Sequence, residues 1–153
     1  MQTRATCPSK QESSQDFSKK LLKLAVAGGV AFWVTDFLMA VSPIAAAYKA
    51  AFSFSYLPVA LVEALAGGMV IAFSVSFFLL RFFNRLPGKK TIFNAILLSF
   101  TTMAIIEVLS ALADPAHASV YLLLDTGMNV PRFLALGLVI GCVFDKQNRK
   151  AQI

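Results

Sequence analysis

Carboxylate side chains inside long apolar segments are the residues of this chain most able to do chemistry. Of only eight acidic residues, Asp36, Glu63 and Glu107 lie within such segments, and Asp125 lies close to the start of a fourth. At about 1.5 Å per residue, the first three lie roughly 9–10 Å from the same boundary of the apolar layer. Charge at that depth in a membrane is costly, so we expect these side chains to face the interior of a helical bundle and to have partners.

Arg132 is the one cation predicted near these acids. Three carboxylates and a guanidinium could hold a cation, a proton or the cationic part of a substrate, and Arg132 could pair with an acid or clamp an anion. Carboxylates that lie close together repel one another, so one of them can bind and release a proton near neutral pH. The sequence therefore predicts one polar site formed by Asp36, Glu63, Glu107 and Arg132, joined by Asp125 if the last helix begins early.

A second interpretation needs no shared site. Asp36 and Arg132 would then form a structural ion pair, while Glu63 and Glu107 would contact a partner subunit. At the predicted depth a carboxylate could also extend partly towards the membrane interface. The sequence leaves both interpretations open.

The composition predicts that membrane helices position these residues. Hydrophobic residues make up 58% of the 153 positions and charged residues 14%, whereas soluble domains have roughly 45–50% and 25%. The segments 21–41, 57–80 and 91–113 reach the length of about 20 residues that a spanning helix needs. A fourth segment begins at 119 or at 128 and ends at 144, and the longer version would be broken or kinked by Gly127 and Pro131. We expect an all-α integral membrane protein, a four-transmembrane-helix bundle over residues 19–145.

The distribution of basic residues predicts the orientation of this bundle. Twelve of the 14 lie before the first helix or at its start, in the link after the second helix, or in the C-terminal tail: Arg4, Lys10, Lys19, Lys20, Lys23, Arg81, Arg85, Lys89, Lys90, Lys146, Arg149 and Lys150. By the positive-inside rule these segments are cytoplasmic, so both termini are expected inside a plasma or inner membrane. The net charge of +6 is then explained by the membrane topology and by contact of the basic segments with anionic lipid. No nucleic-acid partner is expected.

The two ends of the chain are expected to form tails outside the membrane. Residues 1–18 are polar and lack the apolar core of a signal peptide, so they are predicted to form a cytoplasmic tail. Residues 146–153 are predicted to form a second, basic cytoplasmic tail.

The two connections on the outer side resemble each other. One runs from Pro43 to Pro58 over 15 positions, and the other from Pro115 to Pro131 over 16. Ser or Asp before the first Pro is typical of a helix start, so each connection is expected to contain a short interfacial helix. The pattern favours two repeated helical hairpins, although Pro and Gly punctuate any two hairpins in similar ways.

Small residues four positions apart predict close helix packing. They are Ala60, Ala64 and Gly68 in the second helix and Gly137 and Gly141 in the fourth. Such faces let two backbones approach closely, within one chain or between chains. Besides the lipid bilayer, we therefore expect a homo-oligomer or a partner in a membrane complex.

The remaining residues give no sign of an enzyme. The chain has a single histidine, His117, and two cysteines that form no CxxC pair. It has no phosphate-binding loop, nucleophile elbow or HExxH sequence, so no cofactor or metal is expected and catalysis is disfavoured. We therefore expect transport or channel activity for a small ion or solute through the polar site. The alternative is a non-catalytic accessory or assembly subunit of a larger membrane complex.

Overall fold

Four long helices make up most of the computed structural model, which describes residues 10–42, 57–83, 90–113, 115 and 118–150. They are α1 (Lys10–Ala40), α3 (Leu57–Phe82), α4 (Thr91–Ala113) and α6 (Thr126–Lys150). The short helix α5 (Ala118–Val120) and the π-helical segment η3 (Tyr121–Asp125) lead directly into α6. Each long helix contains a stretch of 22 to 26 residues that is apolar enough to cross a membrane. The expected all-α bundle with four candidate membrane spans is confirmed.

The first and last helices are longer than the predicted spans. α1 begins earlier because its polar first turns contain no Gly or Pro, and Lys20 pairs with Asp16 one turn before it at 3.8 Å. α6 runs beyond its predicted end, and there Arg149 pairs with Asp145 at 2.9 Å. Parts of both predicted tails therefore extend the apolar helices. The span predicted at 91–113 coincides with α4.

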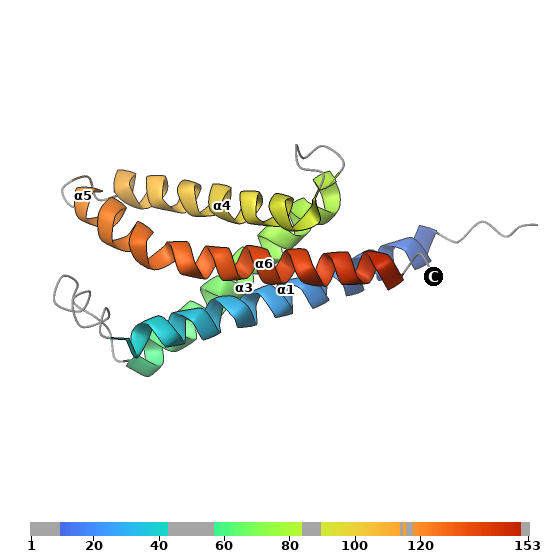
Figure 1. The fold of residues 1–153 in the computed structure, drawn as a ribbon, viewed down its shortest axis with the longest axis horizontal. Coiled ribbons are helices and arrows are strands. Elements are labelled where there is room, and N and C mark those ends of the chain that lie inside the picture. The colour runs from blue at the N-terminus through green and yellow to red at the C-terminus, as the bar shows by residue number, and fades with distance from the viewer. Residues whose placement is uncertain (1–9, 43–56, 84–89, 114, 116–117, 151–153) are drawn as a thin grey trace, which may run out of the picture.

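The start of the fourth helix is irregular. α6 begins at Thr126, between the two predicted starting points, and η3 precedes it with wider π-helical turns. Pro131 lies inside α6, where it lacks the N–H that would bond to the preceding turn. Such features bend helices, and Figure 1 shows the orange N-terminal part of α6 curving away from the line of its red part. The other predicted outer helix, within 43–56, lies outside the described residues.

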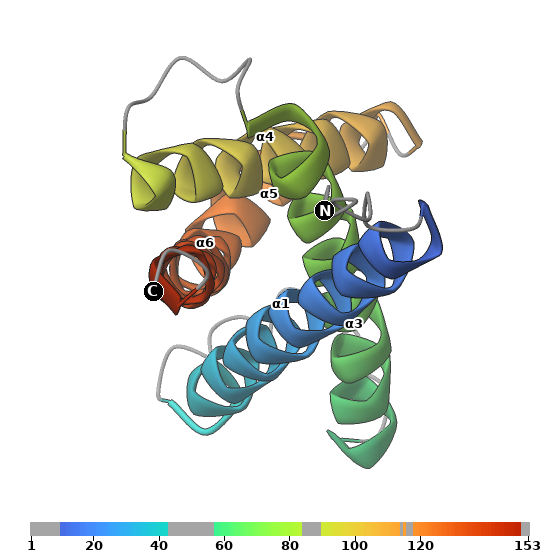
Figure 2. The same cartoon turned by 90° about the vertical axis from the view of Figure 1, so that its right-hand side faces the viewer.

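The helices pack in the spatial order α4, α6, α1, α3 (Figures 1 and 2). α3 crosses the bundle obliquely and approaches α4 mainly where the two are linked. One end of the bundle holds the start of α1, the end of α3, the start of α4 and the end of α6, and we call it the basic end. It carries Lys19, Lys20, Lys23, Arg81, Lys90, Lys146 and Arg149. The opposite end, called the acidic end, carries Asp36, Glu63, Glu107 and Asp125.

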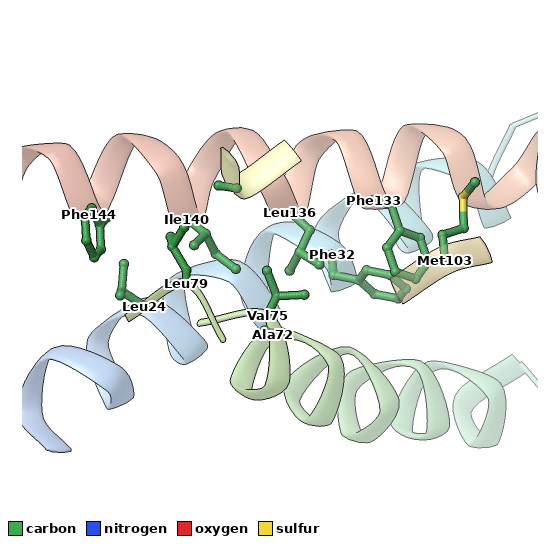
Figure 3. Packing of buried hydrophobic residues seen from close by; sticks show 11 residues of the cluster. Leu24, Phe32, Ala72, Val75, Leu79, Met103, Phe133, Leu136, Ile140 and Phe144 are labelled. Carbon is green, nitrogen blue, oxygen red and sulfur yellow. The ribbon is translucent and has the colours of Figure 1, made fainter. Parts of the chain in front are cut away.

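Side chains from all four helices meet in an apolar core (Figure 3). Phe32 of α1 lies edge-on to Phe133 of α6, with 5.5 Å between the ring centroids. From Phe133 the buried stripe of α6 continues through Leu136 and Ile140 to Phe144, at the spacing of one helix face. Other large apolar side chains point outwards on every long helix, among them Leu22, Val34, Val62, Phe73, Leu109 and Leu134. Such outward faces suit contact with lipid tails.

Glycines determine how closely the helices approach. A Cβ added at Gly141 would lie 2.7 Å from the Cα of Ile92, and one at Gly137 would lie 2.8 Å from the Cα of Ile96. The backbone of α6 therefore rests directly on α4. Gly68 of α3 lies against the ring of Phe32. Of the other predicted packing residues, Ala64 is half-buried, and the side-chain surroundings of Ala60 lie outside the described part of the chain.

We predict that Gly141→Ala destabilises the protein because the new methyl group meets the backbone of α4. The expected loss is about 1–3 kcal/mol, as for other overpacked positions. Gly67→Ala is the matched control, because a Cβ at Gly67 would meet nothing within 4 Å. The measurement is thermal unfolding of the detergent-solubilised protein, followed by the fluorescence of its single tryptophan. Equal midpoints for the two variants would contradict the assigned contact.

Candidate functional site

Three of the predicted site residues belong to one polar network that joins α1, α4 and α6. Arg132 of α6 forms an ion pair with Asp36 of α1, and its Nη1 donates a hydrogen bond to Oδ1 of Asn129 at 3.0 Å. Nδ2 of Asn129 donates to Oε1 of Glu107, on α4, at 2.7 Å. We call these four residues the polar network. Their side chains link three helices without any contribution from the backbone.

The position of α6 between α4 and α1 explains this linkage. Asn129 and Arg132 are three residues apart and therefore lie on the same side of the helix. The short Asn129 side chain reaches α4 because glycines hold the two backbones close together. The long Arg132 side chain reaches across to α1. One helix face thus supplies both connections.

Trp33 holds α1 against α3 one turn away from the network. Its indole Nε1 donates a hydrogen bond to the carbonyl oxygen of Leu61 at 3.1 Å. The bulky indole and this bond restrict the rotation of α1 about its own axis. Asp36, three residues further along α1, is thereby held towards α6.

The polar network is shielded from the surroundings. Asp36, Asn129 and Glu107 are 9%, 8% and 3% exposed, and the Arg132 side chain is 18% exposed. Two of its polar atoms are buried without a hydrogen-bond partner in the described part of the chain, namely Oε2 of Glu107 and Nε of Arg132. Buried polar atoms are normally satisfied. These two atoms are therefore the part of the network with unused hydrogen-bonding capacity.

Asp125 lies beside the network, at the end of η3. Its side chain is half-buried and close enough to Glu107 to interact with it electrostatically. The irregular start of the last helix therefore brings a second carboxylate to the one on α4.

Glu63 does not join the network, although the sequence-based site included it. It is exposed on α3, five residues before Gly68. Five residues correspond to about 140° around a helix, so Glu63 points well away from the face that packs on α1. The sequence-based site rests on depth along each helix, and depth does not determine the direction in which Glu63 points around the helix axis.

Asn129 is the network residue that sequence reasoning missed. The predicted site was assembled from ionisable side chains, and an amide is neutral. An amide can nevertheless donate to a carboxylate and accept from a guanidinium at the same time, which is its role here. Its position one turn before Arg132, in the short segment between Asp125 and Pro131, is the signal that could have identified it.

Two further features bear on binding. A groove of about 570 Å³ lies at the basic end, between the start of α4 and the end of α6, with Ile92, Asp145 and Arg149 in its lining. It contains none of the predicted site residues. Within the described ranges, no three His, Cys, Asp or Glu side chains are grouped so that they could hold a metal ion. His117, set aside as a metal ligand on sequence grounds, lies outside those ranges.

Comparison of the chain with models of protein families, with curated proteins and with solved structures gives no match. Its class follows from the fold and the site. The four candidate spans indicate an integral membrane protein of the helical-bundle type. A buried polar network joins three of its helices.

We predict that Asp36→Leu and Arg132→Leu each destabilise the protein, and that the double variant recovers much of the loss. Removing one partner leaves the other charge buried and unpaired, at a cost of up to about 3–5 kcal/mol, whereas removing both leaves no unpaired charge. A double-mutant cycle on unfolding free energies in mixed micelles measures the coupling. The same cycle at Lys20 and Asp16, an exposed pair, should give less than about 1 kcal/mol. Additive losses at Asp36 and Arg132 would contradict the coupling.

Proposed function

We propose that this chain is a small transport or channel protein that moves a small ion or solute through the polar network. The observation that supports it best is Oε2 of Glu107, a deeply buried carboxylate oxygen that accepts no hydrogen bond within the described part of the chain. A carboxylate that only held helices together would be expected to use both oxygens. Ionisable residues inside membrane helices are costly, and by default they are retained for function.

The irregular start of α6 supports the same proposal. Asn129 and Arg132 lie on either side of Pro131 and follow the π-helical turns of η3. Backbone hydrogen bonds are weaker or missing there, so this segment can move at a lower cost than a regular helix. Substrate sites of membrane transporters are typically built beside such interrupted helices. Small movements of this segment would open and close the connection between Asn129 and Glu107.

We further propose that both termini are cytoplasmic and that the polar network lies in the outer half of a plasma or inner membrane. The clustering of basic side chains at the end of the bundle that holds the start of α1 and the end of α6 supports this orientation. We also propose that the two helical hairpins are related. In support, Gly68 and Gly141 each pack on the preceding helix of their own hairpin, at Phe32 and Ile92 respectively.

The transport proposal predicts that changes in the network lower flux through the reconstituted protein. Proteoliposomes would be assayed for flux of Na⁺, K⁺, H⁺, Cl⁻ and small neutral and zwitterionic solutes. For each solute that moves, Asn129→Leu should lower the rate by roughly tenfold, the factor equivalent to one lost hydrogen bond. Glu63→Gln, outside the network, is the control and should keep the wild-type rate. Rates equal to those of protein-free liposomes for all solutes, or unchanged rates for Asn129→Leu, would contradict the proposal.

One observation favours the alternative of an accessory subunit in a larger membrane complex. Glu63 is exposed on a spanning helix, next to a face where a Cβ at Gly67 would meet nothing. A carboxylate facing lipid is unfavourable, and an open glycine allows a second helix to approach closely. This surface therefore suits a partner helix that offers a hydrogen-bond donor.

The accessory-subunit alternative predicts that the protein co-purifies in a complex through this face of α3. Native mass spectrometry after extraction in mild detergent should find an assembly, and Gly67→Leu should dissociate it by blocking the approach of the second helix. Gly127→Leu provides a matched control on α6, because Gly127 is also open. A monodisperse lone monomer from the native membrane would count against the alternative.

A further inference from the structure

We propose that the ion moved through this site is a proton, carried by Glu107 as a carboxylic acid. This inference rests on the proposed transport function and adds the chemical identity of what is moved. It follows from the charges around Glu107, from the geometry of its two oxygens and from the buried serine on the same helix.

Within the described ranges, Glu107 forms no ion pair with a basic residue. The guanidinium of Arg132 is already paired with Asp36 of α1, and it reaches Glu107 only through the neutral amide of Asn129. Among the described residues, a charged group that interacts with Glu107 is Asp125 of η3, which is a second acid. On α3, Glu63 faces away from the bundle. An ionised Glu107 would therefore be a buried negative charge beside another carboxylate, which a membrane interior strongly disfavours.

The geometry of the carboxyl group provides a place for one proton. Oε1 accepts the hydrogen bond from Nδ2 of Asn129, while Oε2 is buried and has no hydrogen-bond partner among the residues that the structure describes. A proton on Oε2 makes the group neutral and keeps the bond to Oε1. An amide that donates to a carboxyl oxygen fits both the acid and the carboxylate form, so the proton can leave and return without rearranging Asn129.

A metal ion fits this position less well than a proton. Hard cations need several oxygen ligands at once. The described residues contain no group of three acidic, histidine or cysteine side chains that could supply them. A proton needs a single oxygen, and Oε2 of Glu107 provides it.

A buried polar residue, Ser99, lies on α4 between Glu107 and the basic end. It is fully buried and faces α6 at Gly137. Between Glu107 and Ser99 the helix rises by about 12 Å, less than half of a bilayer core. The start of α4 then lines the groove at the basic end. Met103, a flexible side chain, is the buried apolar residue of α4 between Glu107 and Ser99, so water has to pass it for a proton to leave in this direction.

The test is proton flux into proteoliposomes that contain a pH-sensitive dye, driven by a potassium diffusion potential set with valinomycin. The wild-type protein should acidify the lumen faster than protein-free liposomes do. Glu107→Gln should reduce the rate to that of protein-free liposomes, Glu107→Asp should restore part of it, and Glu63→Gln should keep the wild-type rate. The thermal midpoint of each variant shows that it is folded.

A second measurement reports the bound proton without any flux. Infrared spectra of the reconstituted wild-type protein at neutral pH should contain the carbonyl band of a protonated carboxylic acid, and Glu107→Gln should remove it. Wild-type proton flux in a folded Glu107→Gln variant, or no change in that band, would overturn the proton proposal. Flux of another solute that depends on Asn129 but is accompanied by no proton movement would overturn this inference alone. The absence of flux for every solute would overturn the transport proposal itself.

Discussion

The close contact between α4 and α6 is the constraint on which the rest of the structure depends. Lipid tails are as apolar as the side chains of the bundle, so helix association in a membrane relies on close packing more than on water exclusion. Gly137 and Gly141 allow the backbone of α6 to lie against Ile96 and Ile92 of α4. Continued along both antiparallel helices, this register brings Asn129 to within one helical turn of the level of Glu107. The hydrogen bond between them is thus a consequence of the glycine contact.

The contact between α1 and α6 fixes the other half of the network in the same way. Gly28 lies against Ile140 and Leu136, and one turn further along α1 Phe32 lies edge-on to Phe133. One more turn brings Asp36 to Arg132. Successive turns of α1 therefore contact successively earlier residues of α6. Apolar packing sets the register of these two helices, and the ion pair forms at its end. Charges that would be costly in isolation are stable here because the core holds them together.

Sequence alone predicts the spans and the depth of the acidic residues, because both depend only on counting apolar positions along a helix of known rise. Sequence alone does not predict the rotation of each helix about its axis. α3 is apolar on most of its circumference, so no polar face marks the side that turns away from the bundle, and Glu63 was assigned to the site by depth alone. The sequence-based site omits Asn129 because it contains only charged side chains, and an amide is neutral. The start of α6 was ambiguous because π-helical turns have no clear sequence signature.

The polar network lies at the junction between a rigid and an irregular part of α6. From Phe133 to Phe144 the helix is regular, has one buried face and is held by two glycine contacts. Before Phe133 it contains Pro131 and follows the π-helical turns of η3. Movement of the irregular part would alter the link from Asn129 to Glu107 while the packed part stayed in place, because the two parts share no hydrogen bond at the proline position. The same helix can therefore anchor the bundle through its regular part and hold the polar network at its irregular end.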